Sequence, residues 1–177
     1  MNMPSSAPAY PNFSFDTTAE EVAFAFSEFI RGKSVLITGT SINGLGFETA
    51  KSIAQYAGLI IITGYNAERL QRSADELQKF VPSANIRCLT LDLSSQASVR
   101  EAAMEVNAYT EPLHVLIHNS MADIASSTGE RVPDLNVDRQ WAINHFGPFL
   151  LTTLVLPQAA RLCRRRRLYP ARGLRLR

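Results

Sequence analysis

One stretch of the chain constrains its fold most: a short apolar run that passes through a glycine-containing turn into a helix. The apolar run is Val35–Ile37, and its composition predicts a buried strand. Gly39, Gly44 and Gly46 follow, and a helix is predicted to begin near Phe47. Glycine lets the backbone approach a ligand closely, and a helix start offers unpaired N–H groups to an anion. The stretch therefore predicts a site for the pyrophosphate of a dinucleotide, although such spacing also occurs in plain tight turns.

Strands and helices alternate along the rest of the chain. Each predicted strand is a continuous apolar run, which is typical of a parallel sheet covered by helices on both faces. The strands are predicted at residues 35–37, 59–63, 85–91 and 113–117, and the helices at 47–56, 66–80, 95–107 and from 136 or 138 to 156. The polar residues 122–136 are predicted to form a loop.

Right-handed crossovers give the order 3-2-1-4 for these strands. The predicted fold class is therefore α/β, a Rossmann-like doubly wound parallel sheet that is incomplete at about four strands. In such sheets ligands bind at the carboxyl ends of the strands, which is where the glycine turn falls.

Composition divides the chain into three parts. Residues 1–15 hold three prolines among small polar residues and are predicted to be a flexible arm. Residues 16–158 are the predicted domain, which opens with an amphipathic helix up to residue 30, and Thr18 with Glu21 fits a capping box at its start. Residues 159–177 form an arginine-rich tail that is predicted to be disordered.

The composition is that of an ordinary globular protein, with 46% apolar and 19% charged residues among 177. Cys88 and Cys163 form no disulfide or metal framework, which favours a reducing compartment. The N-terminus has no basic segment followed by an apolar core, and the longest apolar run, Phe146–Leu156, is interrupted and too short to span a bilayer. We therefore expect a soluble cytoplasmic protein with no membrane span and no metal.

Four motifs, in this order, resemble the short-chain dehydrogenase/reductase family, in particular its retinol-dehydrogenase-like members of fungal type. The resemblance covers about residues 16–158. TGTSINGLG at 38–46 resembles the cofactor turn, and LDLSS at 91–95 resembles the segment with an acid after the third strand. VLIHN at 115–119 resembles the Asn-Asn-Ala-Gly segment, and NHFGPFLLTTLVLP at 144–157 resembles the segment with the active-site asparagine.

The resemblance implies an NAD(P) cofactor and a role for each matching residue. The turn residues Gly39, Thr40, Ser41, Gly44, Leu45 and Gly46 would bind the cofactor, with the glycines at the pyrophosphate and the Leu45 N–H beside the nicotinamide half. Asp92 would accept a hydrogen bond from the adenine amino group while Leu93 packs on the ring. Asn119 would support the strand end near the nicotinamide ribose, and Asn144 would hold a proton relay through a helix distortion and a water. Asp92 as a helix cap and Asn144 as a satisfied polar residue stay open as alternatives.

Three departures from the family pattern affect the cofactor site. Four residues, Thr40 to Asn43, separate the first two glycines instead of three, which we interpret as a loop variant. His118-Asn119-Ser120-Met121 replaces Asn-Asn-Ala-Gly, and Met121 would crowd the nicotinamide ribose. The second strand ends in Gly64-Tyr65-Asn66, with neither an acid for the ribose 2′-OH of NAD nor an arginine for the 2′-phosphate of NADP. Because no carboxylate repels a phosphate there, NADP is slightly favoured over NAD.

The fourth departure concerns catalysis. The family reduces carbonyl groups with a tyrosine as general acid, a lysine four positions later and a serine that polarises the carbonyl. This sequence has no such pair: its last lysine is Lys79, and Tyr169 is followed at that spacing by Gly173. Loss of one general acid lowers a rate by about 10²–10⁴-fold.

The arginine-rich tail begins where the resemblance ends. Residues 161–177 hold eight of the 18 basic residues and no acid, whereas the first 160 residues carry 10 basic and 16 acidic side chains. Three interpretations stay open: a shifted reading frame or unspliced sequence, which we favour, a basic patch for nucleic acid or an anionic membrane, and a solvated tail without a role. The acidic body argues against nucleic acid as a partner.

Two functions follow as hypotheses. The first is an NAD(P)-dependent oxidoreductase, present as its cofactor-binding half and of doubtful activity, with a small alcohol or carbonyl compound as substrate. The alternative is a non-catalytic nucleotide-binding or interaction protein, and formation of a homo-oligomer stays open. The fourth strand would also lack an outer neighbour, so we expect an exposed apolar edge and a poorly soluble product.

Overall fold

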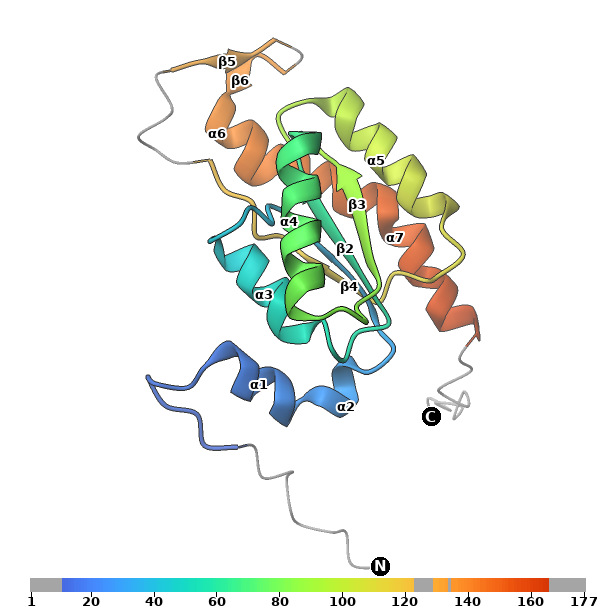
Figure 1. The fold of residues 1–177 in the computed structure, drawn as a ribbon. Helices are drawn as coiled ribbons and strands as arrows, with labels where there is room; N and C mark the ends of the chain where they lie inside the picture. The colour runs from blue at the N-terminus through green and yellow to red at the C-terminus, as the bar shows by residue number, and fades with distance from the viewer. Residues whose placement is uncertain (1–10, 123–128, 134, 166–177) are drawn as a thin grey trace, which may run out of the picture.

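A four-stranded parallel sheet forms the centre of the computed structural model, which describes residues 11–122, 129–133 and 135–165 (Figure 1). The strands are β1 (Ser34–Ile37), β2 (Leu59–Gly64), β3 (Ile86–Thr90) and β4 (Val115–Ile117). They lie in the order β3-β2-β1-β4, and the register pairs Val35 of β1 with Ile60 of β2 and with Val115 of β4. The predicted order 3-2-1-4 and the Rossmann-like doubly wound class are therefore confirmed.

Helices cover both faces of this sheet, which explains why its strands are apolar throughout. Because successive strand residues point to opposite faces, Val35 and Ile37 pack toward α3 (Leu45–Ile53) and α4 (Ala67–Phe80). Leu36 and Leu89 instead pack toward α5 (Gln96–Ala108) and α7 (Gly147–Arg165). Figure 1 shows the two helix pairs on opposite sides of the strands. Burial of each such side chain stabilises the fold by about 1.5–3 kcal/mol.

The N-terminal segment has the predicted capping box but not the single helix expected after it. The Thr18 hydroxyl accepts a hydrogen bond from the Glu21 N–H at 3.2 Å, and the Glu21 carboxylate accepts one from the Thr18 N–H at 2.7 Å. The helix then breaks at Phe26 into α1 (Ala19–Ala25) and α2 (Ser27–Ile30). The amphipathic stripe is consequently divided between two short helices.

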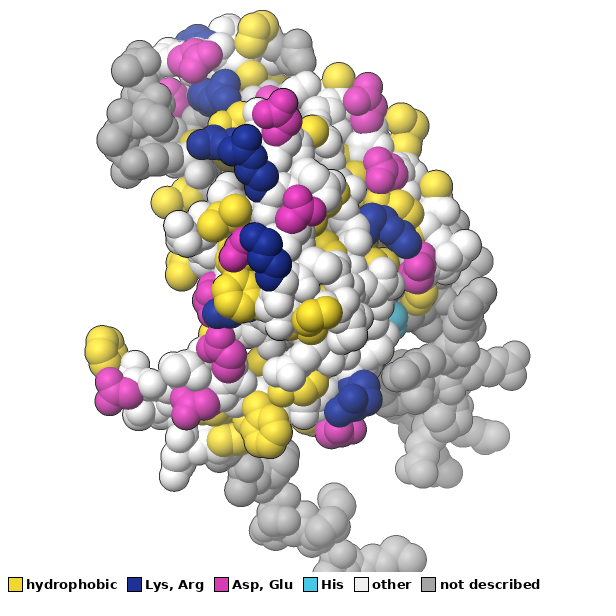
Figure 2. Space-filling view, in the orientation of Figure 1, with side chains coloured by type: hydrophobic (Ala, Val, Ile, Leu, Met, Phe, Trp, Pro, Cys, Tyr) yellow, Lys and Arg dark blue, Asp and Glu magenta, His cyan; other side chains and the backbone are white. Residues whose placement is uncertain are grey.

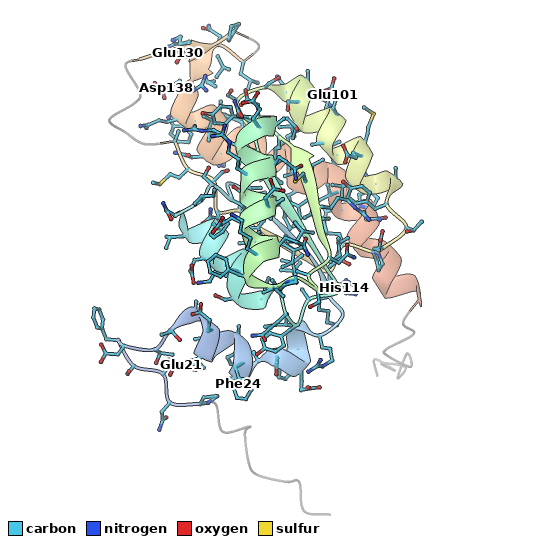
Figure 3. All side chains as sticks on the ribbon, viewed as in Figure 1. Glu21, Phe24, Glu101, His114, Glu130 and Asp138 are labelled. Atoms are coloured by element: carbon cyan, nitrogen blue, oxygen red, sulfur yellow. The ribbon has the colours of Figure 1, made fainter. Side chains whose placement is uncertain are left out.

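These helices are attached to the body by an ion pair and leave apolar side chains exposed. Lys51 of α3 lies 3.2 Å from the Glu20 carboxylate of α1. Phe24 points away from the body and is 71% exposed (Figure 3), and Phe29 is 76% exposed. Of the four apolar residues predicted to pack on the body, Val22, Phe26 and Ile30 are half-buried and Phe29 is exposed.

The glycine turn leads into α3 two residues earlier than predicted. Gly44 is the N-cap, with φ −96° and ψ 161°, and the helix begins at Leu45 rather than near Phe47. Gly46 thus belongs to the first turn of the helix instead of the loop before it. This position determines how closely α3 packs on the strand ends.

The segment predicted as a loop over residues 122–136 contains a strand. β5 (Arg131–Val132) pairs in antiparallel fashion with β6 (Val137–Asp138), and Figure 3 shows Glu130 and Asp138 beside this hairpin. The long helix predicted next is divided into α6 (Arg139–Trp141), a π-helical segment η2 (Ala142–Phe146) and α7. The break places a distortion in the middle of the predicted helix.

The last helix extends further than predicted. α7 continues to Arg165, which corrects the prediction of disorder for residues 159–165 because their backbone is helical. Residues 166–177 and the first ten residues of the predicted arm lie outside the described part of the chain. On the outer side of the sheet, Val115 of β4 is 41% exposed, and no described strand pairs with that edge.

Charges on the body are mixed. Figure 2 shows basic and acidic side chains interspersed over the face that it presents. Within the described residues, no helix is both long and apolar enough to cross a membrane. Nor do these residues bring three His, Cys, Asp or Glu side chains together as metal ligands.

Candidate functional site

A cleft of about 370 Å³ opens where the carboxyl ends of the strands meet the glycine turn. It brings together most of the predicted site residues, namely Gly39, Ser41, Gly44, Leu45, Asp92, Leu93 and Asn119. Its other lining residues are Gly64, Tyr65, Leu91, Ser120, Met121, Arg139 and Ile143. Thr40, Gly46 and Asn144 do not line it. The cleft lies at the switch point between β1 and β4, where doubly wound sheets bind ligands.

The extra residue of the glycine turn is accommodated by a left-handed backbone. Asn43 has φ 65°, a conformation that asparagine adopts more readily than most residues. The Gly44 N–H donates to the Ser41 carbonyl at 3.0 Å and closes the turn. The turn therefore accommodates four residues between the first two glycines and still leads directly into α3.

Two glycines allow the turn to pack directly on the end of β4. A Cβ at Gly46 would lie 2.5 Å from the Asn119 amide nitrogen and 2.5 Å from the Gly39 carbonyl oxygen. A Cβ at Gly39, where φ is +71°, would lie 2.5 Å from the Ser120 hydroxyl. Neither position has room for a side chain. Gly39 lines the cleft and gives it a floor of bare backbone, whereas Gly46 lies at the contact with Asn119, outside the cleft lining.

A hydrogen-bond network fixes this junction. The Thr38 hydroxyl is buried and accepts from the backbone N–H groups of Asn119 and Ser120, both at 3.0 Å. The Asn119 amide donates to the carbonyls of Thr38 at 3.0 Å and Gly39 at 2.9 Å. Asn119 therefore joins β1 to β4 from a position more than 80 residues away in the sequence.

Asp92 shapes the turn after β3 and does not cap the next helix. One of its carboxylate oxygens accepts from the Ser94 N–H at 2.8 Å and the Ser94 hydroxyl at 2.6 Å. The N-cap of α5 is Ser95, whose hydroxyl accepts from the Ser98 N–H at 3.3 Å. The cap alternative for Asp92 is therefore wrong, and its half-buried carboxylate lines the cleft beside Leu93.

Asn144 lies in the π-helical segment, outside the cleft. Its carbonyl oxygen accepts from the Ala122 N–H at 2.8 Å, and its amide lies 3.5 Å from the Ala122 carbonyl. Asn144 thus has a backbone partner after β4, and the helix distortion that the resemblance implied is present around it. With Gln140, Trp141 and His145 it lines a separate hollow of about 400 Å³.

His118 and Met121 are the first and last residues of the segment His118–Met121, which follows β4. The His118 ring lies 2.7 Å from the Thr152 hydroxyl of α7, and desolvation lowers the pKa of His118 below its ordinary value. Met121 lines the cleft and is 78% exposed. A flexible, largely exposed methionine can move aside, so it leaves the cleft accessible.

The model of the family described as short chain dehydrogenase matches residues 33–165. The chain belongs to this family. The match extends to residue 165, beyond residue 158 where the resemblance was predicted to end. The arginines at 161, 164 and 165 therefore fall within the matched region.

Relatives of the chain are longer than it is. It is 35% identical over 147 residues to the oxidoreductase fscI of Fusarium equiseti, covering 82% of this chain and 56% of the relative. It is 32% identical over 140 residues to the short-chain dehydrogenase TIC 32 A, chloroplastic, of Brassica napus, covering 79% and 42%. The chain thus spans about half the length of the curated relatives it matches. Since one relative is named as chloroplastic, the comparisons do not decide the expected cytoplasmic location.

Solved structures of the family share the fold. A 3-oxoacyl (acyl-carrier-protein) reductase from Agrobacterium tumefaciens with NADP bound gives a TM-score of 0.60 at 22% identity, covering 75% of this chain and 50% of that one. An NADH-dependent reductase, A1-R′, complexed with NAD gives 0.61 at 21% identity, covering 79% and 57%.

Two residues of the cleft in this short-chain dehydrogenase carry no signal in the sequence. Arg139 and Ile143 come from the α6–η2 segment, and no family motif marks them. The Thr40 side chain is buried and donates to the Thr63 carbonyl at 3.1 Å, so it holds the turn against β2. Only the folded arrangement distinguishes these roles.

Proposed function

We propose that this chain binds a nicotinamide dinucleotide in the cleft, with NADP favoured over NAD. The glycine turn carries the proposal, because Gly39 and Gly44 line the cleft and place no side chain between the backbone and a ligand. α3 starts at this floor, and its first N–H groups have no partner within the helix. A pyrophosphate fits these donors and the positive end of the helix dipole.

Each residue of the cleft would contact a different part of the cofactor. Gly39, Ser41 and Gly44 would face the pyrophosphate, and the Leu45 N–H the nicotinamide half. Asp92 would accept from the adenine amino group beside Leu93, since its half-buried carboxylate lines the cleft. Asn119 would support the nicotinamide ribose from the junction of β1 and β4. When bound, the cofactor supplies hydride transfer.

The neutral end of β2 supports the preference for NADP. Gly64, Tyr65 and Asn66 bring no carboxylate to the position that would bond the ribose 2′-OH of NAD. Of the two solved structures of related folds, the reductase from Agrobacterium tumefaciens has NADP bound and A1-R′ has NAD bound.

The reaction we propose is oxidoreduction of a small alcohol or carbonyl compound, at a low rate in this chain. The sequence contains no tyrosine followed by lysine four positions later, so no pair of that kind positions a proton. Loss of this general acid lowers the rate by about 10²–10⁴-fold. Asn144, held by Ala122, is left with a supporting role only.

Fluorescence titration of the full chain with NADPH and NADH tests the proposal. Trp141 is the only tryptophan, so energy transfer from it to the reduced nicotinamide gives an internal signal. A matched pair of variants tests whether the cofactor binds in the cleft. Ser41→Asp introduces a carboxylate in the cleft, whereas Ser83→Asp introduces one at an exposed position after α4.

We expect saturable binding that Ser41→Asp weakens by about tenfold or more through charge repulsion and that Ser83→Asp leaves unchanged. Binding together with slow turnover of an alcohol or aldehyde panel supports the oxidoreductase. Binding without any turnover favours the non-catalytic alternative. Absence of binding of both cofactors to folded protein overturns the proposal.

A further inference from the structure

The N-terminal helices carry exposed aromatic and acidic side chains together. Residues 11–30 hold five phenylalanines and four acidic residues but no lysine or arginine. Figure 2 shows hydrophobic and acidic side chains side by side over the part of the molecule where α1 and α2 lie. Exposed apolar side chains gathered in this way mark a contact surface. We call it the aromatic–acidic surface, and its exposed members are Phe13, Phe15, Phe24, Phe29, Asp16, Glu21 and Glu28.

The negative charge of this surface is only weakly neutralised. Among the residues that the structure describes, no cationic side chain lies within 4.0 Å of the Asp16 or Glu21 carboxylate in an ion pair. Glu28 pairs with Arg31 at 3.2 Å, but these side chains are 80% and 61% exposed, and ion pairs in water are weak. Figure 3 shows Glu21 and Phe24 on the same outer side of α1. The surface therefore suits a partner that combines positive charge with apolar side chains.

The chain itself contains a segment of this chemistry. Twelve residues, 166–177, follow the end of α7 at Arg165. Five of them are arginines and none is acidic. A guanidinium stacks on aromatic rings and also pairs with carboxylates, so arginine matches both components of the aromatic–acidic surface. The apolar side chains between these arginines include Leu168, Tyr169, Leu174 and Leu176.

α7 ends on the same side of the sheet as α2. Gln158 of α7 donates to the Glu111 carbonyl at 2.9 Å, four residues before β4 begins. His114, next to the start of β4, exchanges two hydrogen bonds of 3.0 Å with Ser34, the first residue of β1. α2 ends at Ile30, just before that strand. The last helix and the N-terminal helices therefore meet at the amino ends of β1 and β4 (Figure 1).

We propose that residues 166–177 of this chain dock on the aromatic–acidic surface. Fully extended, twelve residues span roughly 40 Å, which is enough to lead from the end of α7 over α2 to α1. Each arginine contact is weak by itself, but the segment is tethered to its own target. A short tether gives an effective concentration of about a millimolar, so contacts that are weak between separate molecules hold the segment in place. The inference is independent of the cofactor.

Trypsin cleaves after arginine and tests this contact on the full chain. The rate of cleavage within residues 166–177 is followed by mass spectrometry, and the free peptide of the same sequence is the undocked reference. Phe24→Ser combined with Phe29→Ser removes two exposed rings from the surface. Its control is Phe149→Ser, which removes a ring that is 68% exposed on α7.

A second pair of variants tests the charge. Glu28→Lys reverses one charge of the aromatic–acidic surface, and Glu101→Lys reverses one at an exposed position on α5 (Figure 3). Each substitution lies at an exposed position, and urea denaturation checks that the fold is kept. The charge pair keeps the proposal testable if the double phenylalanine variant is unstable.

We expect the segment to be cleaved about fivefold or more slowly in the parent chain than in the free peptide, since cleavage follows the undocked fraction. The double phenylalanine variant and Glu28→Lys should each raise the rate toward that of the peptide. Sodium chloride at about 1 M should also raise it, because salt screens the ion pairs. Both control variants should be cleaved like the parent.

Four results would overturn the proposal. The first is cleavage in the parent as fast as in the free peptide. The second is protection that neither the double phenylalanine variant nor Glu28→Lys reduces, because another surface would then hold the segment. The third is protection that increases with protein concentration, which assigns the contact to a second copy of the chain. The fourth is protection that appears only when DNA or anionic vesicles are added.

Discussion

Replacing Thr38 with valine tests the junction that holds the glycine turn against β4. Valine has nearly the same shape as threonine, so the substitution removes the hydroxyl without leaving a cavity. That hydroxyl accepts from the N–H groups of Asn119 and Ser120, at 3.0 Å each, and Thr38 is fully buried. The variant therefore leaves two backbone donors without their acceptor.

The expected loss of stability follows from these two donors. A buried donor that loses its partner costs about 1–3 kcal/mol, so we expect Thr38→Val to lower the free energy of unfolding by about 2–4 kcal/mol. Thr38→Ser keeps the hydroxyl and loses one methyl group, which should cost about 1 kcal/mol. For a domain with a total stability of about 5–15 kcal/mol, the difference is readily measured.

Urea denaturation followed by circular dichroism gives both values. The midpoint should fall clearly further for Thr38→Val than for Thr38→Ser, with the slope unchanged. NADPH binding should weaken in Thr38→Val as the Gly39–Asn119 junction loosens. A valine variant as stable as the serine variant would refute the reasoning, because the two hydrogen bonds would then contribute nothing.

Three further predictions follow from other parts of the structure. Gly46→Ala should destabilise the fold by about 1–3 kcal/mol because its Cβ would meet Asn119 and Gly39, whereas Gly64→Ala, whose Cβ comes no closer than 3.8 Å to Leu70, should be tolerated; equal urea midpoints would contradict this. Desolvation lowers the pKa of His118, so the folded state favours the neutral ring. The free energy of unfolding should therefore be highest above pH 6.5, the ordinary pKa of histidine, and should fall as the pH drops below 6.5. His118→Gln should flatten that decline in urea midpoints between pH 8 and pH 5, and an unchanged slope would argue against it. Val115→Lys, at a 41% exposed position on the edge strand β4, should reduce light scattering of concentrated protein, and equal scattering would speak against edge-to-edge association.

The sheet was predictable because its signals are local. Four apolar runs separated by amphipathic helices are enough to predict the parallel order β3-β2-β1-β4. The capping box of Thr18 and Glu21 was predictable for the same reason, since both partners lie within one turn. The break at Phe26 was not, because nothing in its sequence opposes a helix.

The site was only partly predictable because its contacts join distant segments. The glycines of the turn were read as ligand contacts, yet Gly46 and Gly39 are also required by the close approach of Asn119 and Ser120. Arg139 reaches the cleft from a helix after β6, and no local pattern indicates that position.

The π-helical segment shows the limit of periodicity as a signal. The sequence predicts one helix from residue 136 or 138 to 156. The structure instead inserts η2 at Ala142–Phe146, where Asn144 bonds to Ala122 after β4. A tertiary contact with a neighbouring segment, rather than the helix's own sequence, accompanies the distortion.

Hydrogen exchange of the full chain with and without NADPH tests the central claim most directly, because it reports both whether the cofactor binds and where. The account predicts slower exchange in the glycine turn at residues 39–46, at the end of β2 and start of α4, and around Asp92, with α1 and α2 unchanged. Protection confined to other segments, or none at saturating NADPH, would contradict the assignment of this cleft as the cofactor site.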